Sequence, residues 1–380
     1  MNGKRAVREK VVEVTNPYND EVVAKLAMSE SSDVAHAIAT ARHGFDILKR
    51  MGAGERAQIL EKTSQDLLCR REEFGRAIAL ESGKTINEAR AEVDRAANTM
   101  KLSALAAMKL SGETVRFDLS GQSRKIGFYT RVPLGIVAAI TPFNFPLNLS
   151  CHKIGPALAA GNAVVHKPAT KTPVSAVLLA ESLVRSGLPP ESISVLVGPG
   201  SKVGMTLVQD ESVKKISFTG SLDVGRAITA RCGMKRVTME LGSNSAVIVC
   251  EDAPLDVVAK KIRKGGYTLA GQVCISIQRV YVENAVAADL LSLLTAEVEQ
   301  IAYGDPLLET TEMGPMIDQA AIEKAENFCK DAVQRGGKVV TGGRRQGNIF
   351  VPTIIAETPE ESLVIQEEAF APIVALNRFG

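Results

Sequence analysis

The sequence predicts an α/β protein with a parallel, doubly wound sheet, followed along the chain by a second α/β unit. From residue 135 onward, short apolar runs bounded by turn residues alternate with helix-like stretches, which is the pattern of βαβ units. The region before residue 110 has helical periodicity instead. The 380 residues exceed what one hydrophobic core usually supports, so we expect two or more domains.

Three helices are predicted in the first third of the chain. Ser31 or Ser32 can cap the first of them. The second is predicted over residues 54–82, where apolar residues recur near helical spacing, and the third over 84–108. Residues 122–133 then alternate like an exposed strand.

Strands and helices alternate along the rest of the chain. The first sheet is predicted from strands at 135–141, 162–166, 193–197 and 215–218, with helices at 146–160, 173–187 and 201–208. The second unit is predicted from strands at 245–250 and 279–282 and helices at 254–270, 286–302 and 317–336, the last leading into the apolar pair 339–340. Ligands bind outside the carboxyl ends of parallel strands, so the loops 141–146, 166–170 and 218–221 are candidate binding loops.

Composition argues against several classes of function. The net charge of +2 gives no reason to expect nucleic acid or an acidic membrane surface as a partner. Apolar stretches end well before the roughly 18 residues of a membrane span, and the basic N-terminus has no apolar run behind it. The six scattered cysteines predict a cytoplasmic protein with free thiols. The four histidines lack metal-site spacing, so we expect no metal.

Three residues carry side chains suited to chemistry on a carbonyl group. Cys274 offers a strong nucleophile, although a single cysteine is more often a small buried hydrophobe. Glu240 adjoins a predicted buried strand, where a carboxylate is either functional or simply a strand-end surface residue. Asn144 lies in an apolar turn, where its amide is either an oxyanion donor or an ordinary turn residue. Each residue alone leaves both interpretations open.

Six ordered motifs decide between these interpretations. Together they resemble signature segments of the aldehyde dehydrogenase superfamily, and the resemblance runs from about Val14 to the end of the sequence. Glu240 also precedes Cys274 by 34 residues, an interval that fits the family pattern. The motifs are Thr141–Pro146, Gly155–Asn162, Lys167–Pro168, Phe218–Ser221, Glu240–Gly242 and Gly271–Cys274.

The resemblance implies a role for each of the three residues. Cys274 attacks the aldehyde and forms a thiohemiacetal whose oxyanion is held by the Asn144 amide and the Cys274 backbone N–H. Hydride transfer to a nicotinamide cofactor gives a thioester, and Glu240 activates the water that hydrolyses it. Each half-reaction passes through an oxyanion, and losing one such donor typically costs about 2.7–4 kcal/mol.

The same resemblance implies a site for a nicotinamide cofactor. The family uses the loop 218–221 and the following helix N-terminus, where exposed N–H groups favour a pyrophosphate, and Gly220 and Gly225 allow close approach. The glycine-rich loop 198–204 lacks the GxGxxG spacing and is equally well explained as a plain turn. The implied cofactor-binding residues are Thr141, Pro142, Phe143, Lys167, Pro168, Ala169, Thr170, Gly200, Phe218, Gly220, Ser221, Val224, Leu241, Glu368 and Phe370.

Thr170 bears on the choice between NAD and NADP. Three residues after Lys167, which is implied to bind the adenosine ribose, many NAD-preferring members carry a Glu that bonds the ribose 2′-hydroxyl. A carboxylate would repel a 2′-phosphate whereas a hydroxyl can donate to it, so we expect NADP ahead of NAD. The alternative is that Thr170 is neutral and the choice lies elsewhere. Glu368 and Phe370 match residues that bind the nicotinamide ribose and ring, although a plain C-terminal strand also explains Phe370.

Four residues are candidates for the substrate pocket, and they favour a small hydroxylated or acidic aldehyde. Val273 stands where members that oxidise glyceraldehyde 3-phosphate carry an Arg, so that substrate is disfavoured. His152 stands where succinate-semialdehyde members tend to carry a carboxylate-binding Arg; the alternative is an ordinary helix residue. The segment 144–154 looks closest to the lactaldehyde-type branch. The candidates are Asn148, His152, Val273 and Ile275.

The resemblance also sets the expected domain organisation. It implies a Rossmann-like cofactor domain, an α/β catalytic domain and a small strand arm for oligomerisation. We assign residues 1–121 to the helical part of the cofactor domain, 122–134 to the arm, 135–240 to the Rossmann-like part and 241–380 to the catalytic domain. Full-length members continue beyond the point matching Gly380 with a strand used in assembly, so a homodimer or tetramer, and activity itself, are expected to depend on that segment.

Two other functions fit parts of the pattern. In CoA-acylating members of the family the thioester passes to CoA, but these members tend to lack the Glu, and Glu240 is present. A catalytically silent member with a structural or binding role would fit an incomplete catalytic domain, but Cys274, Glu240 and Asn144 are all in place. Hydrolytic oxidation of an aldehyde is therefore the leading hypothesis.

Overall fold

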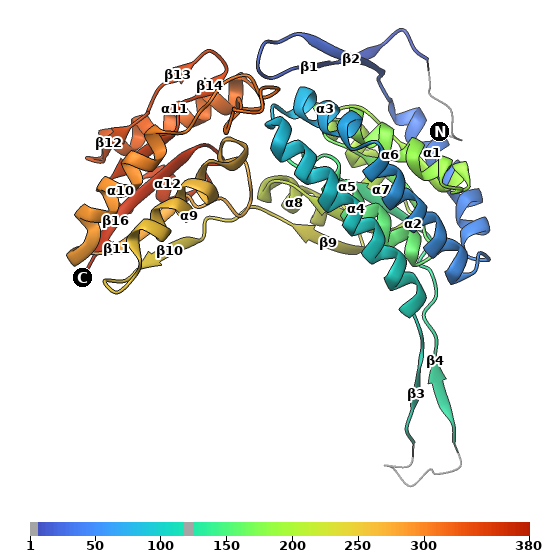
Figure 1. The fold of residues 1–380 in the computed structure, drawn as a ribbon. Coiled ribbons are helices and arrows are strands. Elements are labelled where there is room, and N and C mark those ends of the chain that lie inside the picture. The colour runs from blue at the N-terminus through green and yellow to red at the C-terminus, as the bar shows by residue number, and fades with distance from the viewer. Residues whose placement is uncertain (1–6, 118–124) are drawn as a thin grey trace. The chain divides into compact units, whose positions relative to one another are not determined.

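The computed structural model describes residues 7–117 and 125–380, which form two compact units. The first contains the described parts of Met1–Val12, Lys25–Phe74 and Glu92–Glu240. The second contains Glu13–Ala24, Gly75–Ala91 and Leu241–Gly380. Each unit has its own sheet of mainly parallel strands, and Figure 1 shows the helices packed around each sheet. The fold is of the α/β class that the sequence predicts.

The sheet of the first unit is parallel throughout its described strands. Its order is β7-β6-β5-β8-β9, so the chain moves outward from β5 to β7 and then returns to the other side of β5. The topological switch point therefore lies between β5 and β8, where this class of sheet binds ligands. The strands are β5 (Ile136–Ile140), β6 (Ala163–Lys167), β7 (Ile193–Val195), β8 (Val213–Thr219) and β9 (Arg236–Glu240).

Helices cover this sheet and bury its apolar strands. Helix α1 contacts β5, β6, β7 and α7, whereas α2 packs against α5 and α6, which contact the sheet. In α1 the buried positions recur at three- and four-residue intervals, as an amphipathic helix requires. The helices are α1 (Ser31–Leu48), α2 (Ala53–Cys69), α5 (Asn148–Ala159), α6 (Val174–Arg185), α7 (Met205–Gln209) and α8 (Leu222–Thr229).

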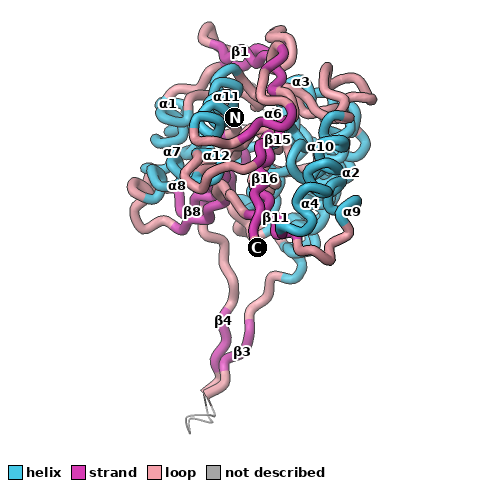
Figure 2. The backbone as a smooth tube through the Cα atoms, turned by 90° about the vertical axis from the view of Figure 1, so that its left-hand side faces the viewer, coloured by secondary structure: helices cyan, strands magenta, loops and turns pink. Residues whose placement is uncertain are grey.

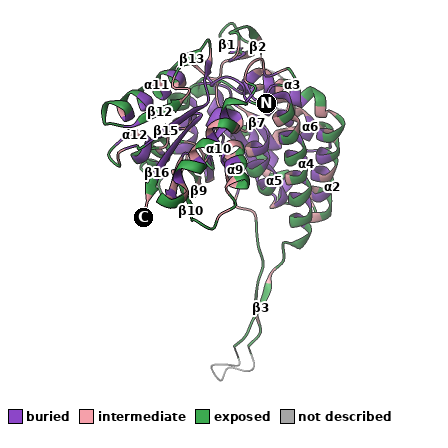
Figure 3. Cartoon of the chain, turned by 60° about the vertical axis from the view of Figure 1, so that its left-hand side comes forward, coloured by how far each residue is buried: buried purple, intermediate pink, exposed green. Residues whose placement is uncertain are grey.

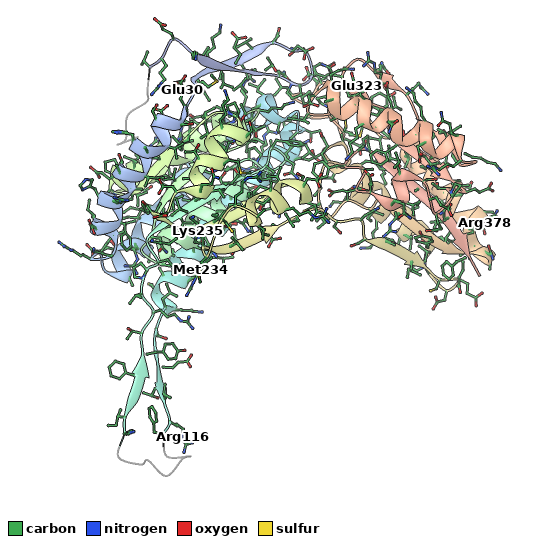
Figure 4. All side chains as sticks on the ribbon, turned by 180° about the vertical axis from the view of Figure 1, so that it is seen from behind. Glu30, Arg116, Met234, Lys235, Glu323 and Arg378 are labelled. Atoms are coloured by element: carbon green, nitrogen blue, oxygen red, sulfur yellow. The ribbon has the colours of Figure 1, made fainter. Side chains whose placement is uncertain are left out.

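A hairpin of β3 (Glu113–Val115) and β4 (Gly127–Tyr129) follows helix α4 (Ile86–Lys109). It extends away from the helices of its unit, and Figure 2 shows both strands in magenta on this extension. Arg116 lies toward its far end in Figure 4. The predicted strand 122–133 coincides with β4 in part, and its residues 122–124 lie outside the described residues.

The sheet of the second unit has the order β10-β11-β16-β15-β12, in which only the β12–β15 pair is antiparallel among the described strands. Its central strands are buried, as the purple ribbon in Figure 3 shows, and they pack with Phe328 and Phe350 into one core. Helices α9, α10 and α11 cover the sheet. The elements are β10 (Ala246–Val249), α9 (Leu255–Tyr267), β11 (Arg279–Glu283), α10 (Ala287–Glu299), α11 (Gln319–Gln334), β12 (Lys338–Thr341), β15 (Thr353–Ala356), α12 (Leu363–Gln366) and β16 (Ile373–Phe379).

The structure departs from the predicted elements in several places. The single helix predicted over 54–82 is wrong: α2 ends at Cys69, and α3 (Arg71–Ser82) begins after Arg70. Apolar spacing continues across this break, so periodicity alone does not reveal it. The strands not predicted are β1 (Val11–Thr15), β2 (Val22–Ala27), β3, β9, β13 (Arg345–Gln346), β14 (Ile349–Phe350), β15 and β16.

Candidate active site

In the first unit, the candidate residues lie where parallel strands end. The loop 141–147 follows β5, the segment 168–170 follows β6, and Gly220 follows β8. Glu240 is the last residue of β9 and is exposed. Because these strands are parallel and hydrogen-bonded in one sheet, their carboxyl ends lie along the same edge.

The loop 141–147, which we call the Asn144 loop, is held by a buried carboxylate. Glu92 Oε1 accepts hydrogen bonds from the backbone N–H groups of Leu147 and Asn148, each at 3.0 Å. The N-cap residue of α5, Leu147, has no side-chain acceptor, so Glu92 supplies it from another helix. Asn144 is 4% exposed, so its amide lies in a largely dehydrated setting. The sequence analysis missed Glu92.

His166 ties the end of β6 to the same loop. Its Nε2 lies 3.1 Å from the Thr141 hydroxyl and 3.2 Å from the Ser150 hydroxyl. Complete burial lowers the pKa of His166 to about 3, with Lys153 and Lys167 adding to the shift. Ser150 donates its hydroxyl proton to the Pro146 carbonyl, whereas Thr141 can donate to the neutral ring, so His166 supports the Asn144 loop as an uncharged residue.

Two consecutive residues of α5 respond to the Glu240 charge. Burial lowers the pKa of Lys153 to about 8, while Glu240 opposes this shift. Lys153 Nζ donates to Thr219 Oγ1 at 2.7 Å. The pKa of His152 is lowered by burial, then by Arg95 and Lys153, and Glu240 again opposes the shift. The Glu240 carboxylate therefore acts on the start of α5, beside the Asn144 loop.

Arg95 of α4 adds an exposed cation to this group. Its guanidinium lies over the Phe145 ring, 5.5 Å from the ring centre. Its positive charge contributes to the lowered pKa of His152, so the guanidinium lies close to that ring. Among the predicted pocket residues of this unit, Asn148 is 2% exposed and accepts from Thr99 Oγ1 at 3.1 Å, whereas His152 is exposed. Helical periodicity gives no signal for Arg95 or Lys153, and the sequence analysis missed both.

The predicted cofactor residues near β6 include a buried lysine. Lys167 is 6% exposed, and burial lowers its pKa to about 8. A Cβ at Gly200 would lie 3.9 Å from Lys167 Nζ, so Gly200 lies beside the lysine ammonium group. Thr170 Oγ1 donates to the Gly198 carbonyl at 2.8 Å. The Thr170 hydroxyl, which was expected to donate to a 2′-phosphate, therefore donates its proton to the loop 198–204 in this conformation.

The loop after β8 has the features of a phosphate-binding turn. Ser221 is the N-cap of α8, and its Oγ accepts from the Val224 N–H at 3.5 Å. Gly220 donates to the Glu240 carbonyl at 3.1 Å, and a Cβ there would lie 2.5 Å from the ring of buried Phe218. A side chain at this position would have to displace the Phe218 ring. An exposed helix N-terminus beside a side-chain-free residue suits a pyrophosphate, so these residues fit a dinucleotide.

In the second unit, Cys274 lies in a loop with unusual backbone geometry. This loop, residues 268–278, is called the nucleophile loop below. Leu269, Ala270 and Gly271 have φ values of +48°, +51° and +68° in succession. Left-handed non-glycine residues each cost on the order of 1–3 kcal/mol and persist only where surrounding contacts impose them. A Cβ at Gly271 would lie 2.1 Å from the Ala371 carbonyl oxygen.

Buried side chains of the nucleophile loop bind its backbone in place. Gln272 is fully buried; its Nε2 donates to the Leu269 carbonyl at 3.0 Å, and its Oε1 accepts from the Ile317 N–H at 2.9 Å. Gln278 Oε1 accepts from the Ala369 N–H at 2.8 Å. Between these anchors Cys274 is exposed. The loop therefore presents one thiol on a backbone fixed from both sides.

A carboxylate from outside the loop also holds it. Glu88 Oε1 accepts from the Leu269 N–H at 3.1 Å. Burial raises the pKa of Glu88, while Lys84, the Leu269 amide and Thr85 oppose the shift. The sequence analysis missed Glu88 as well, because a glutamate in the first turn of a helix is ordinarily a solvent-exposed residue.

Exposure to solvent reduces the number of candidate nucleophilic cysteines, but it does not single out one of them. All six cysteines lie within the described residues and are free thiols; Cys69, Cys250 and Cys274 are exposed. Burial raises the pKa of the Cys329 thiol to about 12 and that of Cys151 further still. Buried thiols of this kind are poor nucleophiles. Cys274 differs from the other exposed cysteines in its constrained loop.

Glu368 lies against Gly242 and Ser243 in the second unit. The Glu368 carboxylate accepts from the Ser243 N–H at 3.2 Å, and a Cβ at Gly242 would lie 2.2 Å from that carboxylate. Burial raises the pKa of Glu368, opposed by the Ser243 amide and Lys324. Phe370 has a φ of +52°, another left-handed residue near the nucleophile loop's anchors.

The predicted residues therefore fall into two groups. The first unit brings together Asn144, Glu240, the pocket candidates Asn148 and His152, and the predicted cofactor residues from 141 to 224. The second unit contains the nucleophile and its neighbours; Val273 is 7% exposed and Ile275 84% exposed. The members of the second group are Leu241, Val273, Cys274, Ile275, Glu368 and Phe370.

Searches of the described part of the chain for other sites give two findings. No helix within residues 7–117 and 125–380 is both long and apolar enough to cross a membrane. Over the same residues, no group of three or more His, Cys, Asp or Glu side chains is arranged to hold a metal ion.

Comparisons with known proteins identify the family of the chain. A model of the aldehyde dehydrogenase family matches residues 4–380. The 3-sulfolactaldehyde dehydrogenase of Priestia aryabhattai is 41% identical over all of this chain and 79% of its own length. An NADP-dependent enzyme of E. coli superposes with a TM-score of 0.97 at 34% identity, covering 100% of this chain and 80% of its own. Aldehyde dehydrogenase 21 of Physcomitrella patens, in complex with the product succinate, gives 0.96 at 36% identity, with the same two coverages.

Proposed function

The chain belongs to the aldehyde dehydrogenase family, and on this premise we propose how its residues divide the reaction. The protein is an NAD(P)-dependent enzyme that oxidises an aldehyde to a carboxylic acid. The observation that supports our assignment best is the shared sheet edge of Asn144 and Glu240 in the first unit, together with the constrained loop of Cys274 in the second. These are the three residues that the chemistry needs.

The first half-reaction begins at Cys274. Its thiolate attacks the aldehyde carbon, an S–C bond forms, and the carbonyl π electrons move onto oxygen. The Asn144 amide and the Cys274 backbone N–H stabilise this oxyanion in a dehydrated setting. A nicotinamide held by Glu368 and Phe370 would supply the acceptor for the hydride that leaves this carbon, and collapse of the oxyanion then leaves a thioester on Cys274.

The second half-reaction depends on Glu240. The carboxylate takes a proton from water, and the resulting hydroxide adds to the thioester carbon. The same two donors hold the second oxyanion, and its collapse expels the Cys274 thiolate and releases the acid. A Glu at this position favours water over CoA as the acceptor, so we assign hydrolysis rather than CoA acylation.

The cofactor site that we propose uses the first unit's strand ends. Ser221 and the α8 N-terminus would hold the pyrophosphate, with Gly220 leaving room for it. Lys167 would bind the adenosine ribose, and Glu368 and Phe370 of the second unit would bind the nicotinamide ribose and ring. We propose NADP ahead of NAD, because position 170 carries no carboxylate to repel a 2′-phosphate.

We propose a small hydroxylated or acidic aldehyde as the substrate. The exposed guanidinium of Arg95 lies beside the Asn144 loop, where it can attract an anionic tail, and the neutral imidazole of His152 can offer a hydrogen bond nearby. One relative is named for an aldehyde with a hydroxyl and a sulfonate, and one solved relative holds a dicarboxylate product. An anionic group a few bonds from the aldehyde would suit the Arg95 cation.

The β3–β4 hairpin is proposed as an assembly arm. It exposes apolar side chains that would be buried against another copy of the chain: Val115, Phe117, Ile126, Phe128, Tyr129 and Val132. We therefore propose a homodimer or tetramer. We place the enzyme in the cytoplasm because its cysteines are free thiols.

A steady-state assay tests the reaction and the substrate class together. The wild-type protein is mixed with NADP or NAD and short aldehydes of equal length that end in methyl, hydroxyl, carboxylate or sulfonate, with and without CoA. We expect turnover without CoA and the highest kcat/KM for an anionic or hydroxylated aldehyde. Turnover that requires CoA would overturn hydrolysis, and equal kcat/KM for all four tails would overturn the substrate class.

The variant Arg95→Met separates the role of this cation from general effects. We expect KM for the carboxylate-tailed aldehyde to rise about tenfold, with little change for the methyl-tailed one, because a charge-assisted contact is lost. Lys101→Met removes another exposed cation of α4 and is the matched control. A similar change in KM for both aldehydes would contradict anion recognition by Arg95.

A further inference from the structure

Helix α4 carries two carboxylates, one turn apart, that bind backbone amides of the two catalytic loops. Glu88 lies in its first turn and Glu92 four residues later, so both occupy one face of the helix. Glu88 accepts from Leu269 in the nucleophile loop, within the second unit. Glu92 accepts from Leu147 and Asn148 at the end of the Asn144 loop, within the first unit.

The nucleophile loop needs an acceptor at the place where Glu88 provides one. Helix α9 ends at Tyr267, and the chain then enters three left-handed residues, so the Leu269 amide has left the helical hydrogen-bonding pattern. Leu269 is 1% exposed, so water does not replace the missing acceptor. The Glu88 carboxylate therefore selects the left-handed turn that leads to Cys274.

The Asn144 loop has a corresponding need. The first N–H groups of α5 have no acceptor within the helix, and the cap residue Leu147 has no polar side chain. Glu92 is 1% exposed and accepts two of these amides through one oxygen. A negative charge is also favourable at a helix N-terminus, so the contact holds α5 and the loop before it together.

We infer that Glu88 and Glu92 are positioning residues for catalysis, Glu88 for the nucleophile Cys274 and Glu92 for the oxyanion donor Asn144. The inference rests on the proposed roles of Cys274 and Asn144. Neither glutamate touches the reacting atoms; each acts by fixing the backbone of a loop that does. Because the two glutamates hold different loops, their removal has different consequences for the thiol.

The test compares turnover with the reactivity of the thiol itself. The full protein is treated with iodoacetamide without aldehyde or cofactor, and alkylation of Cys274 is followed by peptide mass, with exposed Cys250 as the internal reference. We expect Glu88→Ala to lower kcat by about ten- to a hundredfold and to change the alkylation rate of Cys274 as well. Glu92→Ala is expected to lower kcat by about the same factor and leave alkylation at the wild-type rate.

Conservative variants and a control on the same helix complete the design. Glu88→Gln and Glu92→Gln keep an acceptor oxygen for the backbone amides and should restore most of kcat. Asp94→Asn alters an exposed carboxylate of α4 that pairs with Arg71 and should change neither quantity. If an Ala variant does not fold by circular dichroism, Glu88→Leu or Glu92→Leu keeps the volume and removes the acceptor.

Three results would overturn the inference. One is wild-type kcat in either Ala variant, and another is Cys274 alkylation that Glu88→Ala leaves unchanged. The third is an equal change of alkylation in both Ala variants, which would indicate general loosening. Cys274→Ala is run alongside: if it keeps turnover, the proposed nucleophile itself is wrong, and that failure is distinct from the failure of the two glutamates.

Discussion

The two units carry their candidate residues in different ways. In the first, the residues follow the carboxyl ends of β5, β6, β8 and β9, so the order of parallel strands alone gathers them at one edge. In the second, Cys274 precedes a strand, β11, and depends on left-handed residues and buried side chains for its position. Topology therefore places the first group, whereas specific local contacts place the nucleophile. Substitutions should show this difference.

The largest effect is expected from Cys274→Ala. Without the thiolate no thioester forms, so turnover should fall below detection. Cofactor binding, which we propose to rest mainly on the first unit's strand ends, should be kept. Turnover is followed by the absorbance of the reduced cofactor, and binding by titration of intrinsic or cofactor fluorescence. Cys250→Ala, another exposed thiol, should keep full activity. Retained turnover in Cys274→Ala would remove the basis of the mechanism.

Asn144→Ala should have the next largest effect. Loss of one oxyanion donor typically lowers kcat by about a hundred- to a thousandfold, or about 2.7–4 kcal/mol. KM should change little, because the donor acts mainly in the transition state. Steady-state kinetics measure both, with Asn98→Ala on exposed α4 surface as the control. A rise in KM with unchanged kcat would instead place Asn144 in substrate binding.

Gly271→Ala tests how sharply local contacts fix the nucleophile loop. An alanine at position 271 would have a left-handed backbone, which costs about 1–3 kcal/mol. Its Cβ would also lie 2.1 Å from the Ala371 carbonyl oxygen, which is a steric clash. Gly347→Ala is the matched control, since Gly347 has a similar φ of +61° but nothing within 4 Å. We expect chemical denaturation to show a larger loss for Gly271→Ala, accompanied by slower turnover. An equal loss of stability in the two variants would mean that the positive φ alone, and not the contact with Ala371, sets the cost of the substitution.

The smallest expected effect is a pH dependence in the first unit. The pKa of His166 is about 3 in the folded protein and about 6.5 unfolded, so the unfolded chain binds more protons between these values. The contribution of neutral His166 is present above pH 6.5 and falls by about 1.4 kcal/mol for each pH unit below it. Denaturation of wild type and His166→Gln at pH 7 and pH 5 measures this. Wild type should lose more stability on acidification; parallel losses would contradict a neutral His166.

Much of the first unit was predictable from the sequence. Val164 and Ala138 lie in short apolar runs bounded by turn residues, and buried parallel strands have this pattern because both of their faces are covered. The edge strand β9 was not predicted, because Arg236–Glu240 is mostly exposed and lacks an apolar run. The break at Arg70 was missed because the apolar spacing continues across it.

The sequence by itself determined the family of this protein, through ordered motifs that contain the candidate thiol, carboxylate and amide of Cys274, Glu240 and Asn144. Tertiary structure decided what holds these groups. Glu88, Glu92, Lys153 and Arg95 look like ordinary helix residues along the chain, because periodicity reports which face of a helix is apolar but not which backbone amide, ring or charge lies beside a polar side chain. The left-handed path through Leu269 and Ala270 is likewise a product of contacts with residues distant in sequence, since neither residue favours that conformation on its own.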